Sequence, residues 1–221
     1  MARVIIIGGH GKVALRLARI LSERGERVSS VFRNPDHTAD VAGTGAHPVV
    51  IDVEQLDTDA LTVLLAGQDA VVFAAGAGGG DPSRTYAVDR DAAIRVIDAA
   101  RRAGVKRFVM ISYFGAGPDH GVPHNDPFFP YAEAKAAADA HLRASGLDWT
   151  VLGPGRLTLE PGTGRIGVGP AARDYQVSRD DVALVAATAL ADDSTIGRTI
   201  DFNNGDIPIA EALAAGSSAA R

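Results

Sequence analysis

The chain opens on Arg3-Val4-Ile5-Ile6-Ile7-Gly8-Gly9-His10-Gly11-Lys12-Val13-Ala14-Leu15, and this stretch decides its fold. Four β-branched apolar residues lead directly into glycines, and an apolar stripe at helical spacing follows. A strand that is apolar on both faces is typical of the centre of a parallel sheet. Gly8 and Gly11 allow backbone angles and close approaches that a side chain forbids. The stretch therefore predicts a strand, a tight turn and a helix, in that order.

The turn has the spacing G-x-x-G-x-x-A over residues 8–14, not the more common G-x-G-x-x-G. A strand before it and a helix after it are the context that a dinucleotide-binding turn requires. Free N–H groups at the start of such a helix attract phosphate, so we interpret residues 8–14, Val13 included, as a pyrophosphate site. His10 and Lys12 either add positive charge there or only face solvent. The alternative is an ordinary strand–helix turn that happens to contain glycine.

Composition favours one α/β domain spanning residues 1–221, with 46% hydrophobic residues to form its core. A net charge of −5 without a basic block argues against a nucleic-acid partner. The absence of cysteine excludes disulfides and thiol chemistry. We see neither a signal peptide nor an apolar run long enough for a membrane span, so we expect a cytoplasmic protein. Abundant Ala, Arg and Asp with few Lys suggest a GC-rich bacterial genome.

The remainder of the chain alternates strand and helix patterns. Strands are expected at residues 27–32, 49–53, 69–78, 105–112, 148–152 and 199–202, and helices at residues 60–66, 85–102, 131–145, 180–191 and 209–214. Asp57 and Ser178 are expected to cap two of these helices. The alternation predicts a Rossmann-type, doubly wound parallel sheet with helices on both faces and a small C-terminal substrate-facing portion. Residues 162–169 are expected to be irregular, and residues 216–221 to fray.

The second strand ends at Arg33-Asn34-Pro35, at the position where an NAD-binding unit carries an acidic residue for the ribose 2′-hydroxyl. A guanidinium binds a phosphate in a forked geometry, so Arg33 favours NADP(H) over NAD(H) as the cofactor. The alternative is an exposed arginine in a turn.

Two further strand ends are expected to contact the cofactor. Asp52 and Val53 end the third strand, where the adenine would lie. The fourth strand ends in small residues, Ala75 and Gly76 among them, which leave room for a ligand in the crevice.

The candidate catalytic residues are Ser112, Tyr131 and Lys135. Tyr131 and Lys135 are four positions apart on one predicted helix, so their side chains share a face. We expect the Lys135 ammonium to lower the pKa of Tyr131 from its ordinary value of about 10. Ser112 ends the fifth strand, where its hydroxyl could bind a substrate carbonyl. Together they predict a proton relay beside a hydride donor, although such a Tyr–Lys pair also arises by chance.

Residues 115–130 form a long loop rich in Gly, Pro and Asp. The loop holds His120, His124, Asp119 and Asp126, which are metal-capable residue types, but their spacing matches no closed metal site. We therefore expect a solvated substrate lid and no metal. This loop and residues 153–178 are the segments expected to face the substrate.

The order of these motifs resembles the short-chain dehydrogenase/reductase superfamily, in particular its short atypical NAD(P)-binding, NmrA-like members. The resemblance covers nearly the whole chain and rests on the following pieces: Gly8-Gly9-His10-Gly11-Lys12-Val13-Ala14, Arg33-Asn34-Pro35, Tyr131-Ala132-Glu133-Ala134-Lys135, Gly153-Pro154-Gly155-Arg156-Leu157, Ser178-Arg179-Asp180-Asp181-Val182-Ala183 and Ile207-Pro208-Ile209-Ala210-Glu211-Ala212-Leu213.

This resemblance implies that Tyr131 is the catalytic acid, that Lys135 contacts the nicotinamide ribose and that Ser112 orients the substrate. It also implies four cofactor contacts: Arg33 at the 2′-phosphate, the backbone of Gly76 beside the cofactor, and Pro154 and Gly155 at the nicotinamide edge. One departure is Gly153, where related chains often carry a larger polar residue.

The function predicted from the sequence is NADPH-dependent reduction of a small carbonyl, quinone or flavin-like acceptor, by a monomer or homodimer with no nucleic-acid or membrane partner. One alternative is a redox sensor that binds NADP without turnover. Another is an epimerase or dehydratase that holds NAD tightly. Tyr131 and Lys135 favour catalysis over sensing, and Arg33 argues against NAD.

Overall fold

A computed structural model of the chain describes residues 1–78, 81–169 and 174–215, and it is built around a nine-stranded sheet. The strand order is β11-β8-β10-β6-β5-β4-β1-β2-β3. These strands are β1 (Arg3–Ile7), β2 (Arg27–Phe32), β3 (His47–Val50), β4 (Ala70–Phe73), β5 (Arg107–Ile111), β6 (Asp148–Pro154), β8 (Arg165–Val168), β10 (Arg198–Asn204) and β11 (Ile207–Pro208). Two short strands, β7 (Arg156–Thr158) and β9 (Gln176–Ser178), pair separately and in parallel.

Every strand pair from β3 across to β10 is parallel, which confirms the predicted Rossmann-type architecture. The edge beyond β10 is different, because β8 and β11 run antiparallel to their neighbours. The expectation that residues 162–169 are irregular is therefore wrong over β8. This strand is only four residues long and lies among glycines, so the sequence shows no alternating apolar pattern that would predict it. Ile166 within the strand is nevertheless fully buried.

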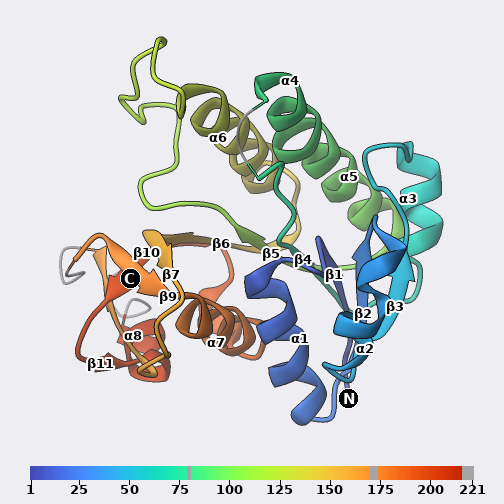
Figure 1. Cartoon of the computed structure of the whole chain (residues 1–221), viewed down its shortest axis with the longest axis horizontal. Coiled ribbons are helices and arrows are strands. Elements are labelled where there is room, and N and C mark those ends of the chain that lie inside the picture. Colours follow the sequence, from blue (N-terminus) through green and yellow to red (C-terminus); the bar gives the residue numbers. More distant parts are fainter. Residues whose placement is uncertain (79–80, 170–173, 216–221) are drawn as a thin grey trace.

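Helices cover both faces of the sheet (Figure 1). They are α1 (Lys12–Glu23), α2 (Thr38–Ala42), α3 (Thr58–Leu65), α4 (Pro82–Thr85), α5 (Ala93–Ala103), α6 (Phe129–Arg143), α7 (Arg179–Leu190) and α8 (Ile209–Ala215). One core contains side chains of α1, α7 and α8, and the other contains side chains of α3, α5 and α6. None of the helices in the described part of the chain is long and apolar enough to cross a membrane.

The strand β1 contributes to both cores, as its uniformly apolar sequence predicts. Val4 and Ile6 pack into the core beneath α1 and α7, while Ile5 and Ile7 pack into the core beneath α3 and α5. All four side chains are at most 3% exposed. Burying each of them contributes roughly 1.5–3 kcal/mol, which explains why the strand at the centre of the sheet has no polar face.

Capping residues and apolar spacing in the sequence predicted most helix boundaries correctly. Asp57 accepts a 2.8 Å hydrogen bond from the N–H of Ala60 and Ser178 accepts one of 3.1 Å from the N–H of Asp180, so both predicted N-caps are confirmed. The single helix expected over residues 85–102 is instead α4, a π-helical segment (Tyr86–Ala92) and α5. Residues 216–221, which were expected to fray, lie outside the described residues.

The sheet order reverses direction at β1, which lies between β2 and β4. In open parallel sheets, ligands bind outside the carboxyl ends of the strands at such a switch point. A ligand site is therefore expected at the carboxyl ends of β1, β2, β3 and β4.

Candidate active site and cofactor cleft

A cavity of about 450 Å³ lies at this switch point. Its lining residues follow the ends of the four strands: Gly8, His10 and Gly11 after β1, Val31 to Asn34 and His37 at β2, Ile51 to Glu54 after β3, Ala74 to Ala77 after β4, and Arg84 and Val88 from the helices beyond. Eight residues predicted to bind the cofactor are among them: Gly8, His10, Gly11, Arg33, Asp52, Val53, Ala75 and Gly76.

The glycine turn leaves no room for side chains on its inner side. Gly8 has a φ of +85°, and a Cβ added there would lie 2.5 Å from the Cα of Ala75. A Cβ on Gly9 would lie 2.5 Å from the Cβ of Ser30, a requirement that the sequence analysis did not recognise. Gly11 has no side chain with which to cap α1. The first N–H groups of α1 therefore have no side-chain cap, and the helix begins directly after Gly11, which lines the cavity, as a phosphate site requires.

Of the other motif residues predicted to bind the cofactor, His10 lines the cavity, whereas Lys12 and Val13 do not. His10 stacks on His37 with ring centroids 3.5 Å apart, and its Nε2 lies 3.1 Å from Asp40 Oδ2. Lys12 and Val13 form the first turn of α1, and neither is among the described residues that line the cavity. Their side chains therefore stay predicted, not observed, contributors to the site.

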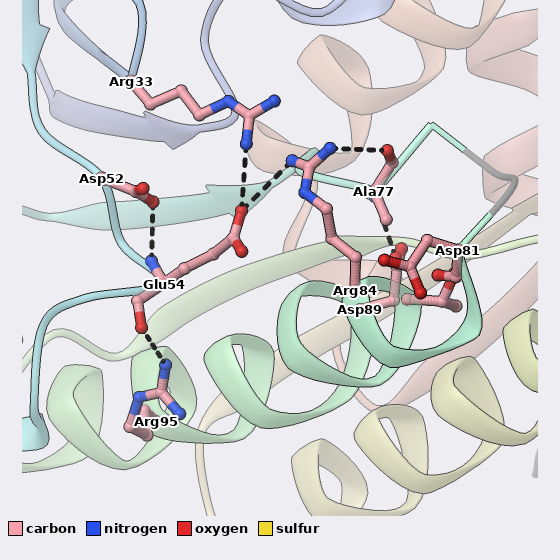
Figure 2. A network of polar contacts seen from close by, with 9 residues as sticks. Arg33, Asp52, Glu54, Ala77, Asp81, Arg84, Asp89 and Arg95 are labelled. Atoms are coloured by element: carbon pink, nitrogen blue, oxygen red, sulfur yellow. Dashed lines mark hydrogen bonds and ion pairs between the residues drawn. The ribbon is translucent and has the colours of Figure 1, made fainter.

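Arg33 lies at the cavity in a network that Figure 2 shows. Its Nη1 is 3.4 Å from Glu54 Oε1, and the same oxygen is 3.2 Å from Nη2 of Arg84. Sequence patterns identify neither Glu54 nor Arg84 as a site residue. Neither lies in a motif, and only the pairing of β3 and β4 with their neighbours in the sheet brings the two segments together.

A second cavity, of about 690 Å³, shares Gly76 with the first. Its wall consists of Gly78, Asp81, Pro82 and Thr85 near α4, and of His124 to Phe128, Pro130 and Tyr131 at the start of α6. The end of the predicted lid, residues 124–128, thus faces this cavity. His120, from the same loop, instead bonds Glu133 at 2.8 Å and is turned away from solvent.

Tyr131 and Lys135 lie on α6 as predicted, but the polar contacts of Lys135 are with residues other than Tyr131. Its Nζ donates to the carbonyl of Ile111 at 2.8 Å and lies 3.3 Å from Met110 Sδ. The side chain is 1% exposed and is not among the described residues that line either cavity. Burial lowers the pKa of Lys135, and the carboxylates of Asp139 and Asp89 oppose that shift.

Ser112 also faces the interior. Its hydroxyl donates to Asp139 Oδ2 at 2.6 Å, and neither residue is among the described residues that line the cavities. Burial raises the pKa of Asp139 against the opposing effects of Lys135 and of this hydrogen bond. Asp139, like Asp89, is a buried carboxylate that the sequence analysis did not single out.

The expected shift of Tyr131 is wrong. Burial, followed by repulsion from Asp89 and Asp139, raises the pKa of Tyr131 well above its ordinary value instead of lowering it. The spacing correctly predicted a shared helix, but it carried no information on the two carboxylates or on the carbonyl that Lys135 binds.

Pro154 and Gly155, predicted at the nicotinamide edge, lie at the end of β6 and are not among the described residues lining the first two cavities. The structure explains why position 153 is a glycine. A Cβ added there would overlap Oδ1 of Asp201, the residue opposite it on β10. The space that a larger residue would need is thus filled by the Asp201 side chain.

Residues 153–178 line neither of these cavities within their described part; instead, several of them line a separate cavity of about 450 Å³. Across the described ranges, no group of three or more His, Cys, Asp or Glu side chains is arranged to hold a metal ion.

A family model described as NAD(P)H-binding matches residues 8–193, from the glycine turn to beyond α7. The chain belongs to this NAD(P)H-binding family. It is an atypical short-chain dehydrogenase/reductase-like protein, as the sequence resemblance indicated. The family match indicates that the cofactor is a nicotinamide dinucleotide, but it does not distinguish NAD from NADP.

Three proteins similar to this NAD(P)H-binding protein match it over almost their full length. The uncharacterized sugar epimerase YhfK of Bacillus subtilis is 36% identical over 96% of this chain and 98% of its own length. A solved structure from Bacillus halodurans, provisionally named an NAD-dependent epimerase/dehydratase, is 35% identical with a TM-score of 0.88, covering 97% of this chain and 100% of that one. The oxidoreductase ylbE from Lactococcus lactis is 28% identical with a TM-score of 0.84, covering 96% and 95%.

Proposed function

We propose that this chain is an NADP(H)-dependent oxidoreductase that reduces a small carbonyl, quinone or flavin-like acceptor, with Tyr131 as the proton donor. The observation that carries the proposal is that two cavities meet at Gly76, one bounded by the glycine turn and the other by Tyr131. The first cavity would hold the cofactor and the second the acceptor.

The residues of the first cavity fit a dinucleotide. Gly8 and Gly9 pack so closely on Ala75 and Ser30 that neither position has room for a Cβ, and the uncapped start of α1 follows this turn. These groups and Gly11 would hold the pyrophosphate, while Asp52 and Val53 would lie along the adenine.

The preference for NADP rests on Arg33. It follows β2 at the position where NAD-binding units carry a carboxylate, and its half-exposed guanidinium borders the cavity. A guanidinium can form two parallel hydrogen bonds with a phosphate, which a 2′-hydroxyl cannot match.

When bound, a reduced nicotinamide supplies a hydride. The raised pKa of Tyr131 keeps its phenol protonated, as a donor to the oxygen of a carbonyl acceptor must be, but it also makes the phenol a weaker acid than an ordinary tyrosine. The proposed roles of Lys135 at the ribose and Ser112 at the substrate require their side chains to turn away from Ile111 and Asp139. Both roles therefore stay predictions.

A second candidate function is sugar epimerisation, which the names of two relatives favour. The second cavity argues against a nucleotide-sugar substrate, because its described lining contains no Lys or Arg to bind a diphosphate. Its Pro82, Pro127 and Phe128 suit the apolar part of an uncharged acceptor, and its polar residues, Asp81 and Asp126 among them, include two carboxylates that disfavour an anion.

Fluorescence titration of NADPH and NADH tests the proposal. We expect NADPH to bind more tightly and Arg33→Ala to remove about tenfold or more of that preference. Arg102→Ala, at the exposed ion pair with Asp59, is the matched control. Equal affinity for both cofactors would overturn the NADP assignment. A protein that binds NADPH but oxidises it with no aldehyde, quinone or flavin would favour the sensor.

A further inference from the structure

One carboxylate oxygen lies between two guanidiniums at the edge of the cofactor cavity (Figure 2). Oε1 of Glu54 is 3.4 Å from Arg33 Nη1 and 3.2 Å from Arg84 Nη2. All three residues line the cavity, and the Glu54 side chain is 18% exposed whereas Arg33 is 53% exposed. The point at which two cations converge is thus already taken by an anion of the chain itself.

We propose that Arg84 is a second arginine for the 2′-phosphate of the cofactor, and that Glu54 is an internal counterion which this phosphate displaces. The inference rests on the proposed function, since it assumes NADP. It adds two residues that bear on cofactor choice: Arg84, which favours the phosphorylated cofactor, and Glu54, which competes with the phosphate for the two arginines.

The backbone around Glu54 is fixed, so only its side chain is free to move. Its N–H donates to Asp52 Oδ1 at 3.0 Å, and its carbonyl accepts from Arg95 Nη2 at 3.2 Å. Arg95 also donates to the carbonyl of Leu56 at 3.1 Å. A rotation about the Glu54 side-chain bonds is therefore sufficient to vacate the space between the arginines.

Arg84 approaches from the opposite wall of the cavity. Its Nη1 donates to the carbonyl of Ala77 at 3.3 Å, beyond the end of β4, while Nη2 reaches Glu54. The guanidinium is 33% exposed, so it is held on one side and open to the cavity on the other. This arrangement orients the N–H groups of Arg84 toward the same point as those of Arg33.

Charge explains why displacement favours a phosphate. A phosphate monoester carries about −1.5 to −2 charges at neutral pH, which two guanidiniums can match. With Glu54 in place, the phosphate would meet a carboxylate at contact distance and be repelled. The neutral 2′-hydroxyl of NAD cannot replace a carboxylate that two cations hold, so Glu54 would remain paired.

The rival explanation is that Glu54 accepts a hydrogen bond from the ribose hydroxyls of NAD, as acidic residues do in NAD-binding units. The two explanations predict opposite effects of Glu54→Gln. In our proposal, the substitution removes a competitor for the phosphate. In the rival, it removes an acceptor for the ribose.

Calorimetric titration with 2′,5′-ADP and with ADP separates these explanations on the intact protein. We expect Glu54→Gln to tighten 2′,5′-ADP binding about tenfold and Arg84→Met to weaken it about tenfold, with ADP changed less than about twofold in both. Asp59→Asn, which also removes one carboxylate but from the exposed pair with Arg102, should change neither ligand. If Arg84→Met does not fold, Arg84→Lys keeps the charge without the fork and should weaken 2′,5′-ADP selectively.

Failure of this inference and failure of the proposed function give different results. If wild type prefers 2′,5′-ADP but the Glu54 and Arg84 variants keep that preference unchanged, the inference is wrong and the NADP assignment stands. If wild type and Glu54→Gln bind the two ligands equally, both are wrong. If Glu54→Gln weakens ADP and leaves 2′,5′-ADP unchanged, Glu54 is a ribose ligand and the inference is overturned.

Discussion

The Ser112 hydroxyl donates a 2.6 Å hydrogen bond to Asp139 Oδ2 where both side chains are buried, at 5% and 0% exposure. The other carboxylate oxygen, Oδ1, is buried and has no hydrogen-bond partner within residues 1–78, 81–169 and 174–215. A carboxylate in such a place is poorly solvated, and the attraction of Lys135 and the Ser112 bond do not compensate, so the pKa of Asp139 is raised.

The first prediction concerns stability and pH. Because the folded protein holds the Asp139 proton more tightly than the unfolded chain does, the stability from this proton is complete below about pH 4 and is lost as pH rises through the raised folded pKa. Asp139→Asn should remove this loss. The unfolding free energy of the variant minus that of wild type should therefore increase with pH, by at most about 1.4 kcal/mol per pH unit for one group.

The measurement is urea unfolding of both proteins from about pH 2.5 to pH 8, a range that includes the ordinary Asp pKa of about 3.9. Asp69→Asn is a control of opposite sign, because hydrogen bonding to Arg3 lowers the pKa of the exposed Asp69 carboxyl. In that control, the difference from wild type should become more unfavourable as pH rises from below the ordinary Asp value. A pH-independent difference for Asp139→Asn would contradict the assignment of a buried, poorly solvated carboxylate.

A second prediction separates the two requirements for glycine at position 8. Gly8 has a φ of +85° and also no room for a Cβ, whereas Gly25 has a φ of +82° and nothing within 4 Å of an added Cβ. Gly25→Ala should cost only the left-handed conformation, about 1–2 kcal/mol, and leave NADPH affinity unchanged. Gly8→Ala should cost more in the unfolding free energy and reduce NADPH affinity at least about tenfold, because the added methyl displaces the backbone of the turn.

Both quantities can be measured in one set of experiments, by urea unfolding and by NADPH fluorescence titration. A Gly8→Ala protein that binds NADPH as wild type does would show that the turn does not approach the cofactor.

These residues also show what the sequence could predict. The glycine turn and Arg33 were found because each directly follows a strand, and the carboxyl end of a strand is where a parallel sheet binds ligands. Glu54 and Arg84 were not found, because 30 residues separate them and only the sheet order brings them within 3.2 Å. The π-helical segment at Tyr86–Ala92 was likewise invisible, since its apolar spacing resembles that of an α-helix.

For the catalytic residues, the sequence predicted positions but not environments. The four-residue spacing correctly placed Tyr131 and Lys135 on one helix. The direction of the Tyr131 pKa shift depends on burial and on Asp89, which approaches from a different helical segment. No spacing rule contains that information, so the predicted shift had the wrong sign.

The third prediction tests the proton donor. Tyr131→Phe should reduce the rate of NADPH-dependent carbonyl reduction by about 10²–10⁴-fold while leaving NADPH affinity unchanged, because only the transferable proton is lost. Tyr113→Phe is the matched control. Its ring lies 5.6 Å from that of Tyr131, but its buried hydroxyl has no hydrogen-bond partner among the described residues, so its loss should leave the rate unchanged.

Once an acceptor is known, steady-state rates and NADPH titrations of the two variants test whether Tyr131 is the proton donor. Equal rates for wild type and Tyr131→Phe with an aldehyde would exclude Tyr131 as the acid. Loss of rate in both variants would instead indicate that the Tyr113 hydroxyl also contributes to the reaction, because both substitutions keep the rings and their contacts.

The last prediction concerns the pairing of Gly153 with Asp201 across β6 and β10. A Cβ on Gly153 would overlap Oδ1 of Asp201, whose Oδ2 is held by the N–H of Gly115 at 3.2 Å. Gly153→Ala should therefore reduce the unfolding free energy by about 1–3 kcal/mol. Adding Asp201→Ala should restore part of the loss, with a coupling energy of about 0.5–3 kcal/mol in a double-mutant cycle. Gly155→Ala provides the control, because its Cβ would overlap Asn203, not Asp201, so Gly155→Ala and Asp201→Ala should add independently. Equal coupling in both cycles would mean that the strand pair relaxes as a unit and that Asp201 does not specifically require glycine at position 153.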